Sequence, residues 1–410
     1  MKYKYTIIFV LIILSISLTG CFLFPPISNT AEWTVMVYLD ADNNLESNGI
    51  KDINEMEMVG STSEVNVVVQ VDRIPYSVLE EYNLGSFDDT TNGNWTGTRR
   101  YYITQDSDLY LINSKLISKL GEQNMGNPET LTNFVGWATN KYPAKKYLLV
   151  IWNHGGGFRS ISPSLTKDIA WDYTNQEDKI TMPELEYALS AISVQMGKSI
   201  NIVGMDACLM AMTEVAYQIK DSTDILVTSE ENEPADGWSY DTILAQLVAD
   251  PTMLSTQLAK NIVDNYVYSY PFNDVTQSAI DLNYMDTLAG QLSNLALAIM
   301  GDSITPSIDY LNAANSSQYY GDNDFIDLYD FCDELMIYSN NPEVKNIAII
   351  IQQTISSTVI NSDYSGWGVS GSKGLSIYFP WYYAYNSQKY NDTNFAQDTL
   401  WDEMLSYLGI

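Results

Sequence analysis

The sequence predicts an α/β fold: a mostly parallel sheet flanked by helices, followed by a C-terminal α/β subdomain. Compact apolar runs alternate with stretches of helical periodicity between residues 33 and 268. Such runs are typical of strands buried on both faces, because crossover helices cover both sides of a parallel sheet. The chain has 410 residues, more than the ~250–300 at which a single core stops growing, so a second unit is expected.

The predicted strands end in polar or glycine-containing turns and are separated by predicted helices. The strands are 33–39, 65–71, 147–152, 199–205 and 225–229, and the helices are 106–120, 129–141, 182–195, 209–220, 239–249 and 253–268. Residues 72–104 are rich in Tyr, Thr, Asn and Gly and predict a hairpin or long loop. Residues 33–268 are therefore the main predicted domain. Residues 269–410 contain helical stretches and a late strand at 375–379, and we expect this subdomain, which has no assigned role, to complete the sheet or cover one side of it.

The beginning of the chain predicts an export signal. Lys2 and Lys4 precede an apolar run from Ile7 to Leu18, which is shorter than the ~20 residues of a stable membrane-spanning helix. The run ends in Leu18-Thr-Gly-Cys21, which resembles a bacterial lipobox, whose cysteine is diacylated. An ordinary signal peptide with a chance cysteine is the alternative.

We therefore predict a lipoprotein signal peptide over residues 1–20, lipidation of Cys21 and a short tether over residues 21–32. The mature chain is expected to be exported and held in the cell envelope by its lipid anchor, which makes the membrane a partner.

Composition narrows the function further. The chain has 20 Lys and Arg against 51 Asp and Glu, a net charge of −31, which argues against nucleic acid as a partner. Its hydrophobic content of 46% supports a packed core rather than a disordered acidic chain. One histidine and three cysteines leave no set of ligands for a zinc site and too few bridges for a disulfide scaffold.

The single histidine follows a predicted buried strand. His154 lies in Asn153-His154-Gly155-Gly156-Gly157, directly after the run 147–152. Ligands of open α/β sheets bind at the carboxyl ends of the strands. The glycines allow close approach of the backbone and expose N–H groups. A histidine satisfied within a glycine-rich loop is the alternative interpretation.

Cys208 follows the next predicted strand, in Asp206-Ala207-Cys208. With a helix predicted over 209–220, its thiol is expected at a helix N-terminus, where the dipole favours the thiolate. A buried structural cysteine is the alternative, but such a residue would be expected inside a strand or helix. Cys332 lies in a helical pattern and is most simply a small core residue, although it could pair with Cys208 in an oxidising compartment.

Topology brings the two candidates together. His154 and Cys208 end consecutive predicted strands that are joined by one crossover, and a right-handed crossover places such strands side by side or nearly so. A cysteine nucleophile and a histidine base are sufficient for hydrolysis. The N–H groups of Gly155 and of Cys208 could stabilise the oxyanion.

These motifs resemble the clostripain family of cysteine peptidases, in the clan that also holds caspases, gingipains and legumains. The similar pieces appear in the family's order over about residues 32–250, and they are Trp33-Thr-Val-Met-Val-Tyr-Leu-Asp-Ala-Asp-Asn-Asn-Leu-Glu46, Asn153-His-Gly-Gly-Gly157, Asp206-Ala-Cys-Leu-Met210 and Ser229-Glu-Glu-Asn-Glu-Pro-Ala-Asp-Gly-Trp-Ser-Tyr240. The resemblance implies a caspase-like sheet, a dyad of His154 and Cys208, and an oxyanion hole that includes the Gly155 N–H. It also implies cleavage after Arg or Lys.

The substrate pocket is expected to be acidic. Asp206 lies two residues before Cys208 on a strand, so both side chains point to the same side. Asp236 follows the strand 225–229 and is expected at the same edge. Carboxylates favour a cationic side chain, and bidentate pairing favours Arg over Lys. The resemblance assigns acidic residues at these two positions to the primary specificity pocket, whereas solvated surface acids are the alternative.

Processing and metal binding are weaker signals. Some relatives cut themselves between the histidine and the cysteine, and Lys167, before Asp168, or Lys179, before Ile180, would be the site here. The run Asp40-x-Asp-x-Asn44 is similar to the start of a calcium loop, but the sixth and twelfth positions depart from that loop. The sequence requires no cofactor, and calcium, which some relatives use, is left open.

The sequence therefore predicts an exported, lipid-anchored cysteine endopeptidase that cuts protein or peptide substrates after Arg or Lys through a thioester acyl-enzyme. A non-catalytic surface-binding lipoprotein on the same fold is one alternative, with 30 Tyr and 9 Trp for contacts. An amidase or transpeptidase with the same dyad is another.

Overall fold

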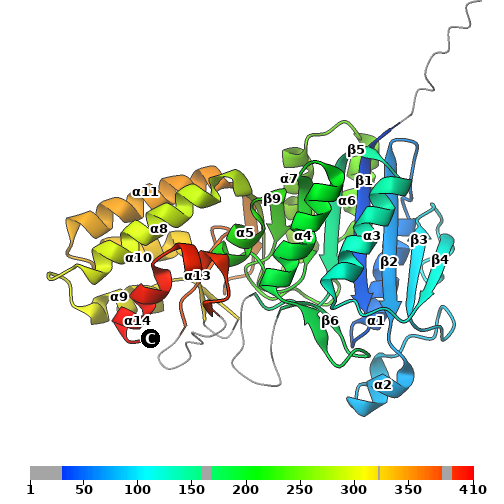
Figure 1. Ribbon diagram of the computed structural model, residues 1–410, viewed down its shortest axis with the longest axis horizontal. Helices are drawn as coiled ribbons and strands as arrows, with labels where there is room; N and C mark the ends of the chain where they lie inside the picture. The colour runs from blue at the N-terminus through cyan, green and yellow to red at the C-terminus, as the bar shows by residue number, and fades with distance from the viewer. Residues whose placement is uncertain (1–29, 158–167, 322–323, 381–389) are drawn as a thin grey trace, which may run out of the picture.

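The computed structural model describes residues 30–157, 168–321, 324–380 and 390–410 (Figure 1). A nine-stranded sheet in the order β13-β10-β9-β8-β5-β1-β2-β3-β4 runs through it. The strands in chain order are β1 Ala31–Ala41, β2 Val65–Arg73, β3 Thr98–Tyr102, β4 Lys115–Gly121, β5 Ala144–Trp152, β8 Ile200–Asp206, β9 Thr223–Thr228, β10 Val275–Asp281 and β13 Val359–Ser365.

The five central strands pair in parallel, while the two strands at each edge pair antiparallel. These five central strands are the five that the apolar runs predict. The mostly parallel sheet flanked by helices is thus confirmed. The register of β5 and β8 pairs Trp152 with Asp206, so the two strands end side by side at one edge of the sheet.

Alternate residues of each central strand enter different cores, as the two-residue period of a strand requires. On one face, Tyr38 and Ile151 belong to a core shared with helices α3, α4 and α5. On the other face, Val37 and Val150 pack with α1, α6 and α7. These helices are α1 Glu46–Glu57, α3 Pro128–Lys141, α4 Met182–Met196, α5 Thr213–Ile219, α6 Tyr240–Ala249 and α7 Ser255–Ser269.

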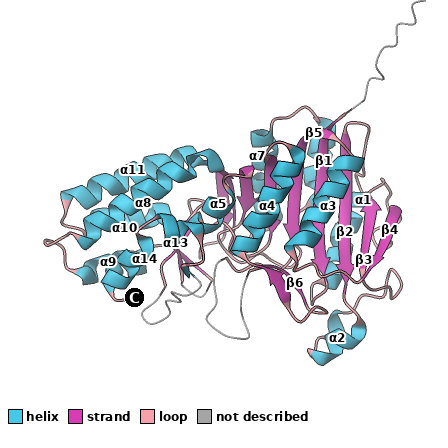
Figure 2. Ribbon diagram, viewed as in Figure 1, coloured by secondary structure: helices cyan, strands magenta, loops and turns pink. Residues whose placement is uncertain are grey.

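The chain after residue 269 extends the sheet and forms a helical lobe. It adds β10 and β13 to the sheet, and the lobe lies beside α5, as Figure 2 shows. The lobe contains α8 Met285–Met300, α9 Ser307–Ser316, α10 Leu328–Tyr338, α11 Pro342–Thr358, α13 Asn394–Asp398 and α14 Trp401–Leu408, with a small sheet of β11 Tyr319–Tyr320, β12 Phe325–Asp327 and β14 Ser376–Tyr378. Its apolar side chains continue the core of the α3–α5 face.

Three local predictions were wrong. Residues 106–120, predicted as a helix, are mostly loop and enter β4, because pairing with β3 outweighs their helical spacing. The helix predicted over 209–220 begins only at Thr213. Residues 72–104 hold the end of β2, a short helix α2 Tyr76–Glu81, a 3₁₀ turn Gly85–Phe87 and β3, rather than a hairpin or long loop.

The predicted signal peptide, Cys21 and most of the tether lie outside the described residues. Within the described part of the chain, no helix combines the length and apolarity needed to cross a membrane.

Glu214 of α5 ties the sheet to the lobe. Its Oε1 accepts hydrogen bonds from the Tyr378 N–H and the Tyr390 hydroxyl, each at 3.0 Å. Burial raises the pKa of Glu214 to about 7. The folded protein therefore binds this proton more tightly than the unfolded chain, and the stability that it contributes is lost as the pH rises toward 7.

We expect Glu214→Gln, which retains an acceptor oxygen without the charge, to flatten this pH dependence. Between pH 5 and pH 8, the free energy of unfolding of the wild type should fall by about 2 kcal/mol more than that of the variant. Urea unfolding at the two pH values measures the difference. Parallel profiles for the two proteins would show that Glu214 does not carry this proton.

Candidate active site

His154 is held by residues from several elements. Its Nε2 lies 2.9 Å from Oδ1 of Asn44, in the turn between β1 and α1. The Tyr173 hydroxyl donates to the same oxygen at 3.3 Å, so both donors fix the orientation of the amide. Asn153 anchors the loop, because its Nδ2 donates to the Asp40 carbonyl at 2.8 Å and its Oδ1 accepts the His154 backbone N–H. An amide oxygen can only accept, so this contact assigns the ring proton to Nε2.

Cys208 lies in a turn after β8 rather than at a helix N-terminus. The following residue, Leu209, has a φ of +63°, and α5 begins only at Thr213, so the predicted helix-dipole effect on the thiol was wrong. The Glu233 backbone N–H instead donates to Sγ at 3.2 Å. The thiol in turn donates to the Glu233 carbonyl oxygen at 3.8 Å, so the backbone of one residue holds the sulfur through both its N–H and its carbonyl.

The histidine and cysteine turns are in direct contact. A Cβ placed on Gly155 would lie 2.5 Å from the carbonyl oxygen of Cys208, so any larger residue would push the two turns apart. His154 and Cys208 also line the same cavity of about 270 Å³, together with Asn44, Trp152, Asp206 and Glu233 among others. The structure thus brings together the two residues that topology predicts to be neighbours.

Asp206 is buried in the wall of this cavity. Its Oδ2 accepts hydrogen bonds from the Tyr240 hydroxyl at 2.8 Å and from the Trp238 N–H at 3.2 Å. Gly237 covers the carboxylate so closely that a Cβ there would meet it at 2.9 Å. Burial raises the pKa of Asp206, while a hydrogen bond with the Glu233 carboxyl group and then these two donors partly offset that rise.

Asp236 takes a different position. Its side chain is 62% exposed and pairs with Lys51 at 2.8 Å. Pro234, Ala235 and Gly237 line the cavity, but Asp236 is not among the lining residues. The structure therefore does not bring it together with Asp206, Cys208 and His154.

Of the two lysines considered for processing, Lys167 lies outside the described residues. Lys179 belongs to β7 Asp178–Ile180, which pairs with β6 Ile169–Asp172. Its side chain is 17% exposed, lies 3.7 Å from Asp168 and 4.4 Å over the Trp171 ring. It is therefore poorly placed for cleavage.

The sequence interpretation did not assign Asn44, Glu233 or Asp52 to the site, although Glu233 stands in the acidic loop that also holds Asp236. Asn44 and Glu233 both lie inside the motifs quoted above, which was the available signal. Nothing in the neighbouring sequence, however, indicates that Asn44 contacts His154 or that Glu233 contacts Cys208. Asp52 lies on α1, and its buried carboxylate accepts the Trp152 Nε1–H at 2.7 Å.

The calcium-like run leads to a different set of carboxylates. Among the described residues, ligand oxygens of Asp42, Asp72 and Glu122 all lie within 4.8 Å of one another. Asp42 Oδ2 is buried without a hydrogen bond, and burial, followed by the charge of Asp172, raises the pKa of Asp42 to about 7. Hard oxygen ligands in this arrangement fit a calcium ion, which when bound would neutralise their charge.

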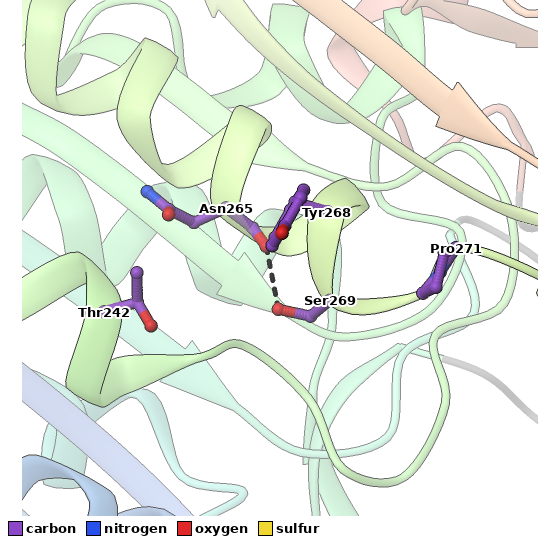
Figure 3. Close-up of a pocket in the computed structure, with 5 residues that line it drawn as sticks. All are labelled: Thr242, Asn265, Tyr268, Ser269 and Pro271. Carbon is purple, nitrogen blue, oxygen red and sulfur yellow. Dashed lines mark hydrogen bonds between the residues drawn. The ribbon is translucent and has the colours of Figure 1, made fainter.

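A second hollow, of about 700 Å³, is lined by Thr242 of α6 together with Asn265, Tyr268, Ser269 and Pro271 (Figure 3). The Ser269 hydroxyl donates to the Asn265 carbonyl at 2.8 Å. None of these lining residues is a base that could activate the serine, so this hollow lacks the chemistry of the first cavity.

Comparisons with known proteins agree with this geometry. The profile of the clostripain family matches residues 37–408. Clostripain of Hathewaya histolytica is 28% identical over 402 residues, which cover 85% of this chain and 74% of that protein.

Two solved structures share the fold. One is a secreted cysteine protease from Bacteroides thetaiotaomicron bound to an irreversible peptide inhibitor, with 21% identity, a TM-score of 0.64 and coverage of 92% of this chain and 99% of that chain. The other is an inactive zymogen protease from Parabacteroides distasonis, with 19% identity, a TM-score of 0.66 and coverage of 90% and 98%. The caspase-like fold implied by the sequence motifs is confirmed.

Proposed function

Since the chain belongs to the clostripain family of cysteine peptidases, we propose that Cys208 and His154 are the catalytic dyad of this endopeptidase. The observation that carries the proposal is that both residues line one cavity, where Gly155 packs directly on the Cys208 backbone. Membership of a peptidase family removes the non-catalytic binding protein from consideration. The structure also supports Cys208 over Cys332 as the nucleophile, because Cys332 is buried in the core of the lobe and Cys208 lines the cavity.

The proposed reaction follows from this arrangement. His154 takes the thiol proton, and the Cys208 sulfur attacks the carbonyl carbon of the scissile bond. The N–H groups of Gly155 and Cys208 would donate to the oxyanion. His154 then protonates the leaving amine, and a water molecule that it deprotonates hydrolyses the thioester. Transfer of the acyl group to an amine instead of water would make the enzyme a transpeptidase, which product mass spectrometry distinguishes.

Asn44 is the residue we expect to hold the imidazole in place. Asn44→Ala removes the oxygen that meets Nε2 at 2.9 Å, so kcat should fall by about 10- to 100-fold with a smaller change in KM. Asn44→Asp, which keeps an acceptor oxygen, should lose less. Steady-state rates on one peptide substrate measure both variants, and an unchanged kcat in Asn44→Ala would exclude this positioning role.

For specificity, we propose cleavage after Arg or Lys. The proposal is supported by the buried carboxylate of Asp206 in the cavity wall. A panel of peptides that differ only in the residue before the scissile bond tests it. Rates should be highest for Arg, then Lys, and equal rates for neutral and basic residues would remove the proposal.

For localisation, we propose an exported protein anchored through a lipid on Cys21. The support is the lipobox-like sequence and the description of one structural relative as secreted. Radiolabelled palmitate should enter the full-length protein but not a Cys21→Ser variant. We further propose residues 33–268 as the catalytic domain, residues 269–410 as its subdomain, and Lys167 as the processing site if the enzyme cuts itself.

A further inference from the structure

A second carboxyl group lies in the active-site cavity beside Asp206. It belongs to Glu233, in the loop between β9 and α6, and both residues line the cavity. Both side-chain oxygens of Glu233 are buried, in contrast to the exposed Asp236 of the same loop. The loop thus buries one acidic side chain beside Asp206 and leaves the other exposed.

The surroundings of Glu233 disfavour its ionised form when no cation is bound. Burial, followed by the neighbouring Asp206 carboxyl, raises the pKa of Glu233 well above its usual range. Burial, followed by the Asp206 carboxyl, also raises the pKa of the neighbouring Asp52. No Lys or Arg is among the described residues that line the cavity. Lys51 is close by, but it is held by Asp236 at 2.8 Å and by Glu55 at 3.8 Å.

The remaining polar groups that the structure places around this pair are uncharged donors and hydroxyls. The hydroxyl of Tyr240 donates to Asp206. Burial, and after it the two carboxyls, raises the pKa of the Tyr266 and Tyr270 hydroxyls. The Gln277 amide of β10 stabilises the ionised form of Glu233. None of these supplies a positive charge, so a cationic side chain that entered would compensate two carboxyls at once.

We infer that Glu233 and Asp206 together bind the cationic side chain of the residue before the scissile bond, and that Asp236 does not. The inference rests on the proposed function and names a further specificity-determining residue for it. The cavity of about 270 Å³ is slightly below the roughly 300–1,000 Å³ of sites for whole small ligands, which suits one side chain. A planar guanidinium can meet two carboxylates along its two edges, whereas an ammonium is a point charge.

Glu233 also joins the specificity pocket to the nucleophile. Its backbone N–H donates to the Cys208 sulfur at 3.2 Å, while its carboxyl group lies buried beside that of Asp206. A substitution that changes only the carboxyl group leaves the backbone donor in place. Its effect should therefore appear in recognition of the basic residue rather than in the reactivity of the thiol.

The test compares Glu233→Gln with the matched loop variant Asp236→Asn. Each full-length protein is assayed on three peptides that carry Arg, Lys or uncharged citrulline before the scissile bond. In Glu233→Gln, kcat/KM for the Arg peptide should fall by about 30-fold or more, mainly through KM, with little change for citrulline. In Asp236→Asn, the preference for Arg over citrulline should stay within about threefold of wild type.

Controls separate the possible failures. Iodoacetamide should alkylate Cys208 at similar rates in the wild type and Glu233→Gln, which shows that the site is intact, and Glu233→Asp should recover part of the Arg preference. If Asp236→Asn loses the preference and Glu233→Gln keeps it, the inference is overturned while the proposed function stands. If the wild type itself does not prefer basic residues, the proposed specificity fails, and the inference fails with it.

Discussion

Replacement of Cys208 by alanine is expected to lower kcat/KM by at least about 10⁴-fold, the largest effect of any single substitution in this chain. The sulfur forms the covalent intermediate, and no other group in the cavity can replace it. Initial rates on an Arg-containing peptide measure the loss. Cys332→Ala is the matched control, because this second cysteine is fully buried in α10 and should be dispensable for activity.

A dyad also predicts how two substitutions combine. His154→Ala alone should cause a loss of similar order, and the double variant with Cys208→Ala should be little worse than either single variant, since the two residues act as one unit. Losses that multiply would mean that the residues act in separate steps. Full activity in Cys208→Ala would refute the proposed nucleophile outright.

The second large effect is expected for Asp206→Asn on substrates with a basic residue before the scissile bond. Loss of a buried charge that pairs with a ligand typically costs about 2–5 kcal/mol, which corresponds to a fall of about 30- to 5,000-fold in kcat/KM. The asparagine oxygen can still accept from the Tyr240 hydroxyl and the Trp238 N–H, so the fold should persist.

The same variant carries its own internal control. A peptide with citrulline in place of Arg has nearly the same shape but no charge, and its kcat/KM should change little in Asp206→Asn. Equal losses on both peptides would point to a damaged site rather than lost charge recognition. An unchanged ratio of the two substrates would show that Asp206 is structural.

The five central strands of the sheet and the placement of His154 and Cys208 at one cavity could be predicted, because both follow from short-range patterns plus one topological rule. Apolar runs identify buried strands, and right-handed crossovers place their ends together. The edge strand β4 could not be predicted in this way. Its residues are mostly exposed, and Leu116, Ile117 and Leu120 have helical spacing, so only pairing with β3 makes the segment a strand.

The details of the pocket depended on backbone geometry that the sequence does not display. The positive φ of Leu209 delays α5, which moves Cys208 from the expected helix N-terminus to a turn facing the Glu233 N–H. Glu233 and Asp236 are three residues apart in one loop and chemically alike. Which of them enters the cavity is decided by the fold of that loop and by the pairing of Asp236 with Lys51, more than 180 residues away in sequence.

Covalent labelling tests the central claim most directly. The protein is treated with a peptide chloromethyl ketone that ends in Arg, digested, and mapped by mass spectrometry. The account predicts one thioether adduct on Cys208, none on Cys332, and a much slower reaction in His154→Ala. An adduct on Cys332, or no adduct on Cys208 in a preparation that still cleaves peptides, would contradict it.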